Sequence, residues 1–162
     1  MASLLEKIVS GGQTGVDRAA LDAARQAGVP CGGWVPKGRK AEDGVIADIY
    51  PVDECGLGGF EERTRLNVRD SDATLILVMG RPPEDFEDGT QLTVQWAEAL
   101  SMPYLIVDLD QPVDAQGIAE WLGGSMFRVL NVAGPRESSS PGIYTAASDF
   151  LRQVLAVIPP RS

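Results

Sequence analysis

A glycine-rich segment near the N-terminus has the residue types that hold a negatively charged ligand. It reads Ser10-Gly11-Gly12-Gln13-Thr14-Gly15-Val16-Asp17 and lies between a short apolar run and a stretch with helical spacing. Glycines let the backbone approach a ligand closely, and the N–H groups at the start of a helix favour an anion. The segment is neither a Walker loop nor a Gly-x-Gly-x-x-Gly fingerprint, so a nicotinamide dinucleotide is not specifically indicated. The predicted ligand contacts in it are Gly11, Gly12, Gln13, Thr14, Gly15 and Asp17.

This segment also has a purely structural interpretation. Thr14 and Asp17 have the spacing of a capping box, with Asp in place of the usual Glu or Gln. In that case the two side chains only begin the helix that follows. Both interpretations stay open at the level of the sequence.

A second turn of the same kind lies near the C-terminus. It reads Asn131-Val132-Ala133-Gly134-Pro135-Arg136-Glu137-Ser138 and also joins an apolar run to a helical pattern. Arginine presents a planar fork to phosphate or carboxylate oxygens, although an exposed Arg136–Glu137 ion pair would contribute little. Two such turns at one edge of a sheet favour a shared pocket. The predicted contacts here are Gly134, Pro135, Arg136, Glu137 and Ser138.

Three further segments add positive charge and small residues. Residues 34–40 hold two of the three lysines next to Trp34, whose ring can stack on a planar heterocycle. Alternatively, Trp34 belongs to the core and the lysines belong to a solubilising loop. A second segment follows along the chain and holds Arg63, Arg65 and Arg69 with Asn67. Gly89-Thr90 opens a helix and suits phosphate contact, or simple capping by Asp88 or Thr90. The predicted contacts in the three segments are Trp34, Lys37, Gly38, Arg39, Arg63, Asn67, Gly89 and Thr90.

The chain contains no histidine, which excludes the commonest general base and the commonest metal ligand. Its two cysteines, Cys31 and Cys55, form no Cys-x-x-Cys motif, so we expect neither a zinc site nor a disulfide framework. A reducing cytoplasm is the expected location. The sequence therefore predicts no metal ligand set and no catalytic residue, and it favours a carrier or binding protein over an enzyme.

Charge and hydropathy exclude two classes of partner. The formal net charge of −9 argues against a nucleic-acid surface, which needs a basic face. No apolar run approaches the roughly 20 residues that span a bilayer, and the first residues are too short and too mixed for a signal peptide. We expect a small anionic, phosphate-bearing ligand and neither nucleic acid nor membrane.

Short apolar runs alternate with helical stretches along the 162 residues. The predicted strands are 7–10, 33–35, 73–78, 104–107 and 128–132, and the predicted helices are 16–27, 61–69, 89–100, 115–122 and 143–158. Residues 36–60 show little periodicity and are expected to be irregular. Alternating strands and helices predict an α/β protein with a mainly parallel, three-layer, Rossmann-like doubly wound sheet. We expect a single domain over residues 1–162, with ligands at the carboxyl ends of the strands.

In their order and combination, several of these segments resemble one known family. They are Gly-Gly-Gln-Thr-Gly-Val-Asp (11–17), Gly-Trp-Val-Pro-Lys-Gly-Arg (33–39), Arg-Thr-Arg-Leu-Asn-Val (63–68), Gly-Thr (89–90) and Asn-Val-Ala-Gly-Pro-Arg-Glu-Ser (131–138). The chain resembles the molybdenum carrier protein family, a circularly permuted branch of the SLOG Rossmann-like superfamily related to lysine-decarboxylase-like phosphoribohydrolases. The resemblance runs through nearly the whole chain.

The resemblance implies a pocket above the strand ends and a homo-oligomer, either a dimer or a tetramer. Related carriers bind the molybdenum cofactor (molybdopterin), a pterin with a phosphate and a dithiolene-held molybdenum. Other SLOG members bind nucleotide-derived ligands or cleave nucleoside monophosphates with a Pro-Gly-Gly-x-Gly-Thr-x-x-Glu motif. Here Gly89-Thr90 matches its Gly-Thr, but Thr93 takes the place of the Glu and residues 85–88 replace the Pro-Gly-Gly.

Three hypotheses of function follow. The first is a carrier of molybdenum cofactor, with the phosphate at the glycine-rich loops, Lys37, Arg39 or Arg136 neutralising charge and Trp34 stacking on the pterin. The second is a nucleotide N-glycoside hydrolase or phosphoribohydrolase, whose candidate acids are Asp17, Asp70, Asp72 and Glu137. The third is a nucleotide-binding sensor.

Overall fold

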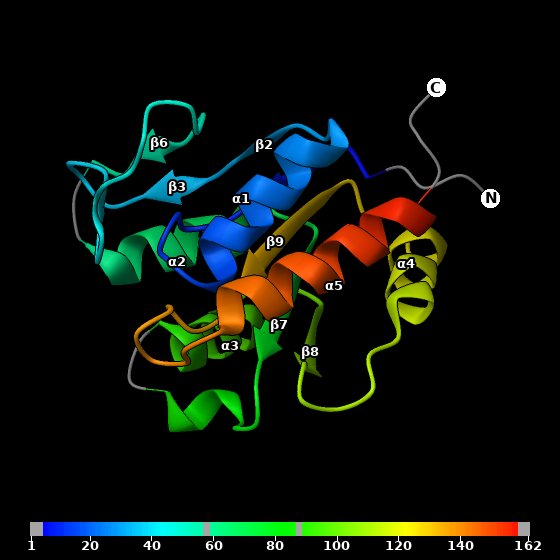
Figure 1. The fold of residues 1–162 in the computed structure, drawn as a ribbon. Helices are drawn as coiled ribbons and strands as arrows, with labels where there is room; N and C mark the ends of the chain where they lie inside the picture. Colours follow the sequence, from blue (N-terminus) through cyan, green and yellow to red (C-terminus); the bar gives the residue numbers. More distant parts are fainter. Residues whose placement is uncertain (1–4, 57–58, 87–88, 159–162) are drawn as a thin grey trace.

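The central sheet is parallel throughout. The computed structural model describes residues 5–56, 59–86 and 89–158, and in these the sheet comprises β1 (Lys7–Val9), β2 (Cys31–Gly32), β7 (Ala73–Val78), β8 (Tyr104–Asp108) and β9 (Val129–Ala133). The strands lie side by side in the order β2-β1-β9-β7-β8 (Figure 1). Every residue of β7 is buried, which suits its continuous apolar run, because an inner parallel strand is covered on both faces.

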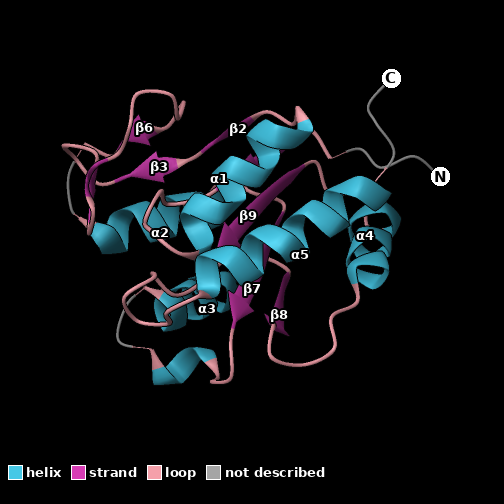
Figure 2. Ribbon diagram, in the orientation of Figure 1, coloured by secondary structure: helices cyan, strands magenta, loops and turns pink. Residues whose placement is uncertain are grey.

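Helices cover both faces of this sheet (Figure 2). On one face α1 (Val16–Ala27) packs against α5 (Ile143–Val157), which also contacts α4 (Ala115–Gly124). On the other face α2 (Phe60–Arg69) packs against α3 (Thr90–Ala99). The prediction of a three-layer, doubly wound α/β fold is confirmed. Among the described residues, no helix is long and apolar enough to cross a membrane.

The order of the strands is that of a circularly permuted Rossmann sheet. The last strand of the chain, β9, lies in the middle of the sheet, between β1 and β7. When the strands are counted from β9 as the first, the order across the sheet becomes 3-2-1-4-5, which is that of dinucleotide-binding Rossmann folds. The point where this order reverses lies between β9 and β7. Ligands bind at the carboxyl ends of the strands at such a point.

The strand predicted at 33–35 is present as β3 (Trp34–Val35), but it lies outside the central sheet. Gly33 has a φ of +126° and separates β2 from β3. A Cβ at Gly33 would lie 2.2 Å from the carbonyl oxygen of Ser10, so this close approach requires glycine. As a result β2 pairs in the central sheet, whereas β3 pairs with β6 (Asp53–Glu54) in a separate two-stranded sheet.

The stretch expected to be irregular, residues 36–60, contains local order. Besides β6 it holds an antiparallel hairpin of β4 (Lys40–Ala41) and β5 (Gly44–Val45). Arg39 organises this stretch, since its guanidinium donates hydrogen bonds to the carbonyl oxygens of Ile46, Ala47, Tyr50 and Val52. The Arg39 side chain thus supplements the short two-stranded pairings of this stretch.

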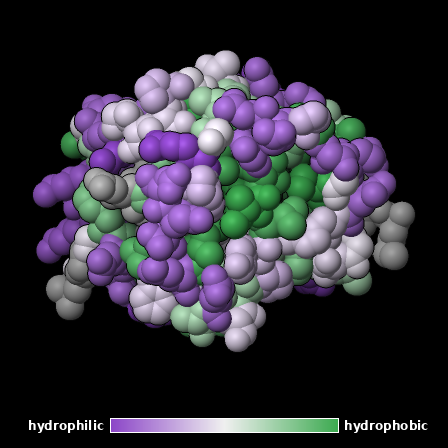
Figure 3. Space-filling view, turned by 90° about the horizontal axis from the view of Figure 1, so that it is seen from below, coloured by the Kyte–Doolittle hydropathy of each residue, from purple (hydrophilic) through white to green (hydrophobic). Residues whose placement is uncertain are grey.

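β8 forms an outer edge of the sheet, and its apolar residues are only partly covered. Ile106 is 42% exposed, and Leu105 and Val107 are half-buried. Figure 3 shows apolar side chains gathered on the face seen from below, the side on which β8 lies. The homo-oligomer expected from the sequence stays a prediction.

Candidate functional site

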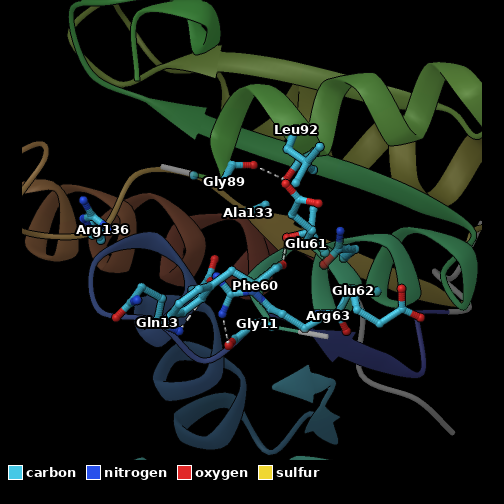
Figure 4. Close-up of a pocket in the computed structure, with 17 residues that line it drawn as sticks. Gly11, Gln13, Phe60, Glu61, Glu62, Arg63, Gly89, Leu92, Ala133 and Arg136 are labelled. Carbon is cyan, nitrogen blue, oxygen red and sulfur yellow. Dashed lines mark hydrogen bonds between the residues drawn. The ribbon is translucent and has the colours of Figure 1, made fainter. Parts of the chain in front are cut away.

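A cavity lies at the switch point of the sheet (Figure 4). Its volume is about 600 Å³, and its walls come from the loops after β1 and β9 and from the first turns of α2 and α3. Eight of the ligand contacts predicted from the sequence line it, namely Gly11, Gln13, Asp17, Arg63, Asn67, Gly89, Gly134 and Arg136. The parallel sheet therefore brings the two glycine-rich turns together at one edge.

Arg63 is almost fully buried in the wall of this cavity, at 7% exposure. Its Nη1 donates to the carbonyl oxygen of Gly11 at 2.7 Å. A Cβ at Gly11 would lie 2.8 Å from Nε and Cδ of Arg63, so glycine at this position lets the guanidinium lie against the loop. A cation held in a fixed orientation beside a cavity suits phosphate or carboxylate oxygens.

Four helices begin at this end of the sheet with glycine as the N-cap residue. These are Gly15 for α1, Gly59 for α2, Gly89 for α3 and Gly142 for α5, and of these Gly59 and Gly89 line the cavity. A glycine offers no side chain for capping, whereas α4 is capped by Asp114, whose Oδ1 accepts from the N–H of Gly117 at 2.9 Å. The positive ends of α2 and α3 therefore face the cavity without a capping side chain at the N-cap position, which favours an anion there.

The capping box considered for Thr14 and Asp17 is wrong. Gly15 is the N-cap of α1, and no side chain caps that helix. Instead, Thr14 Oγ1 accepts from the N–H of Glu137 at 3.1 Å and so joins the two glycine-rich loops. Asp17 is buried, lines the cavity and accepts from the N–H of Gln13 at 3.3 Å. The two side chains thus organise the loops around the cavity.

Glu42, which was not singled out from the sequence, ties the β4–β5 hairpin to both glycine-rich loops. Its carboxylate accepts from the Thr14 hydroxyl and from the N–H (3.2 Å) and hydroxyl of Ser138, and lies 3.7 Å from Nε of Arg136. Its own N–H donates to Oε1 of Gln13 at 2.8 Å. Partial burial disfavours the charged carboxyl, but the hydrogen bonds from Ser138 and Thr14 and the charge of Arg136 outweigh it. The pKa of Glu42 therefore lies below its ordinary value.

Glu42→Gln is expected to lower the free energy of unfolding by about 1 kcal/mol at pH 7, because the ionised carboxylate holds the two loops. A depressed pKa stabilises the fold above the pKa of the unfolded state, and this contribution is lost as the pH falls through the folded-state pKa. The difference between the wild type and the variant should therefore shrink below about pH 4. Urea unfolding from pH 7 to pH 3 measures it.

The exposed Asp48, in the same segment, provides a matched control as Asp48→Asn. That variant should unfold like the wild type at each pH. A Glu42→Gln difference that stays constant down to pH 3 would show that the charge of Glu42 does not hold the loops.

The remaining predicted contacts are not among the residues that line the cavity. They are Gly12, Thr14, Gly15, Trp34, Lys37, Gly38, Arg39, Thr90, Pro135, Glu137 and Ser138. Trp34 donates its indole N–H to Asp70 at 2.9 Å. Glu137 accepts from the N–H groups of Gly142 (2.6 Å) and Tyr144 (2.9 Å), where α5 begins. Ligand contact by these residues stays a prediction, and Asp88, the alternative cap of α3, lies outside the described residues.

Asn67 lines the cavity but also has a structural role. Its Oδ1 accepts from the N–H of Trp34 at 2.8 Å, and its Nδ2 donates to the Trp34 carbonyl oxygen at 2.9 Å. The side chain therefore pairs with β3 as a neighbouring strand would. This contact fixes α2 against the two-stranded sheet.

The predicted contacts omitted much of the wall that α2 and α3 provide. The lining residues outside the prediction are Gly59, Phe60, Glu61, Glu62, Thr64, Leu92, Thr93, Asn131 and Ala133. One signal was available, because Gly59-Phe60 directly precedes the predicted helix 61–69. In a parallel sheet, the residues that open each helix lie at the same edge as the strand ends.

The permuted strand order and the cavity at the carboxyl ends of the strands define a protein of the Rossmann-like α/β class. Residues 8–155 match the model of a family described as the circularly permutated YpsA SLOG family. This chain belongs to that family, and the resemblance inferred from its motifs is confirmed.

One solved structure shares both sequence and fold with this chain. It is the crystal structure of a protein from Syntrophus aciditrophicus SB, named "putative molybdenum carrier protein", with 41% identity and a TM-score of 0.85. The similarity covers 96% of this chain and 98% of that chain. A search of curated proteins gave no match.

Proposed function

We propose that this protein is a non-enzymatic carrier that binds molybdenum cofactor in the cavity at the carboxyl end of β9, beside the first turns of α2 and α3. The observation that carries the proposal is the combination of a buried Arg63, a nearby Arg136 and two glycine-capped helix starts around one cavity. Each of these features stabilises a phosphate. The similarity to a protein named as a molybdenum carrier supports the choice of this cargo.

The size of the cavity suits such a cargo. Its volume of about 600 Å³ lies within the range of about 300 to 1,000 Å³ that small-molecule sites occupy. Among the described residues, no group of three or more acidic or cysteine side chains could hold a metal ion. In this proposal the pterin dithiolene keeps the molybdenum, and the protein holds the phosphate and the ring.

A second candidate function rests on the carboxylates of the same cavity. Asp17, Glu61 and Glu62 line it together with Arg63. A carboxylate and an arginine around one nucleotide are the groups that a SLOG-type phosphoribohydrolase needs, although Thr93 stands where the hydrolase motif has its Glu. Nucleotide binding without turnover would instead correspond to a sensor.

Titration calorimetry with molybdenum cofactor released from a purified molybdoenzyme tests the carrier proposal. We expect a dissociation constant of about 1 μM or below, which corresponds to about −8 kcal/mol. Arg136→Gln should weaken binding about tenfold, because a charged partner of the phosphate is lost. Arg152→Gln, on the exposed side of α5 where Arg152 pairs with Asp149, should leave the affinity unchanged.

The same samples are then incubated with a panel of nucleoside monophosphates. Release of free base would establish the hydrolase instead, and it should disappear in Asp17→Asn. Saturable nucleotide binding with neither turnover nor cofactor binding would favour the sensor. The absence of cofactor binding at tens of micromolar would refute the carrier proposal.

A further inference from the structure

Phe60 is an aromatic residue in an unusual place. It is the first residue of α2, it lines the cavity, and half of its surface (50%) is exposed. Most large apolar side chains of α/β proteins are buried, and the apolar residues of the neighbouring β7 follow that rule. Figure 4 shows Phe60 among the residues that line the cavity, between Gln13 and Arg63 in this view.

A charged group supports one side of this ring. The guanidinium carbon of Arg63 lies 5.2 Å from the ring centroid, within the range of cation–π attraction. Arg63 is itself immobilised by its hydrogen bond to the Gly11 carbonyl oxygen. Gly11, Arg63 and Phe60 therefore form three layers: backbone, guanidinium and aromatic ring. Phe60 lies at the end of this stack, where it lines the cavity with half of its surface exposed.

We propose that Phe60 is a stacking platform for the planar heteroaromatic ring of the ligand, and hence a specificity-determining residue. This inference rests on the proposed function and deepens it. Helix starts and arginines recognise any phosphate, whereas a flat ring held by a cation selects a phosphate that carries a planar ring. An aromatic ring held in place is favourable for stacking because little conformational freedom is lost on binding.

The opposite part of the cavity wall fits this arrangement. Leu92, in the first turn of α3, is half-buried and also lines the cavity. Gly89, at the start of the same helix, places the predicted phosphate contact near this apolar side chain. A ligand could therefore place its phosphate at Gly89, at the start of α3, and its planar ring over Phe60, at the start of α2.

The test compares ligands with and without a ring. The probes are AMP, molybdenum cofactor released from a molybdoenzyme, and ribose 5-phosphate, which keeps the phosphate of AMP and lacks the base. Phe60→Leu should weaken binding of at least one ring-bearing probe about tenfold and change ribose 5-phosphate binding less than twofold. Phe60→Trp should preserve the affinity for that ring-bearing probe, because it keeps an aromatic face.

Ile49 provides a control for exposed apolar surface, since it is 59% exposed and does not line the cavity. Ile49→Ala should change no affinity, and thermal unfolding establishes that all variants are folded. If every phosphate binds the wild type and Phe60→Leu equally, the platform is refuted while the proposed site stands. If Phe60→Leu weakens the binding of ribose 5-phosphate and AMP equally, the platform is refuted too, because Phe60 then does not contact the base. If no probe binds the wild type, the proposed function fails and the platform with it.

Discussion

Gly15→Ala is expected to lower the free energy of unfolding by about 3 kcal/mol, the largest loss of stability that we predict for one methyl group. Gly15 has a φ of 75° and a ψ of −130°, a conformation that L residues avoid. A Cβ at this position would lie 2.3 Å from the Pro135 carbonyl oxygen and 2.8 Å from the Glu137 nitrogen. Strain and overpacking each cost about 1–3 kcal/mol. Urea unfolding monitored by circular dichroism measures the sum.

Gly28→Ala is a comparison variant with milder strain and no crowding. Gly28 has a φ of 73° and a ψ of 19°, which is the left-handed helical conformation, and a Cβ there would have no neighbour within 4 Å. This variant should lose only about 1 kcal/mol, the cost of a left-handed conformation. Equal losses in the two variants would mean that the two glycine-rich loops are not in tight contact at Gly15.

The second large effect is expected on ligand binding. Arg63→Met should weaken the affinity for molybdenum cofactor roughly 10- to 100-fold, because a charged hydrogen-bond donor contributes about 1.5–3 kcal/mol. The variant should also be less stable, since the hydrogen bond to the Gly11 carbonyl oxygen is lost. Calorimetric titration below the unfolding temperature of the variant measures the affinity separately from stability.

Arg69→Met is the matched control. Arg69 belongs to the same helix, is exposed and pairs with Asp70 instead of lining the cavity. Its loss should leave the affinity within twofold of the wild type. Unchanged affinity in Arg63→Met would exclude the buried guanidinium from ligand binding and leave Arg136 as the cation to examine.

The fold could be predicted well where the hydrophobic pattern of a single segment determines its secondary structure. The apolar run of β7 and the helical stripe of α5 were found to within two residues, because burial on both faces or on one face sets the pattern directly. The strand at 33–35 could not be placed, because its break at Gly33 depends on the distant backbone of Ser10. The order in which parallel strands lie side by side is likewise a property of the whole sheet.

The candidate site could be predicted in its two glycine-rich loops and in some of its side chains, such as Arg63 and Arg136. Parallel topology requires that the turns at Gly11 and Gly134 share an edge, and both line the cavity. The orientation of Arg39 could not be inferred, because its guanidinium donates hydrogen bonds to backbone carbonyl groups whose positions cannot be predicted from the sequence. Phe60 was overlooked because an isolated phenylalanine before a helix resembles any core residue until its exposure is known.

The permuted order has a consequence for the synthesis of the chain. β9 joins the pair β1–β2 to the pair β7–β8, yet it is the last of these strands to leave the ribosome. Until residues 129–133 emerge, the nascent chain has two separate half-sheets and lacks the turn that carries Gly134 and Arg136. Completion of the sheet and completion of the cavity are therefore the same late event, because both require β9 and the turn that follows it.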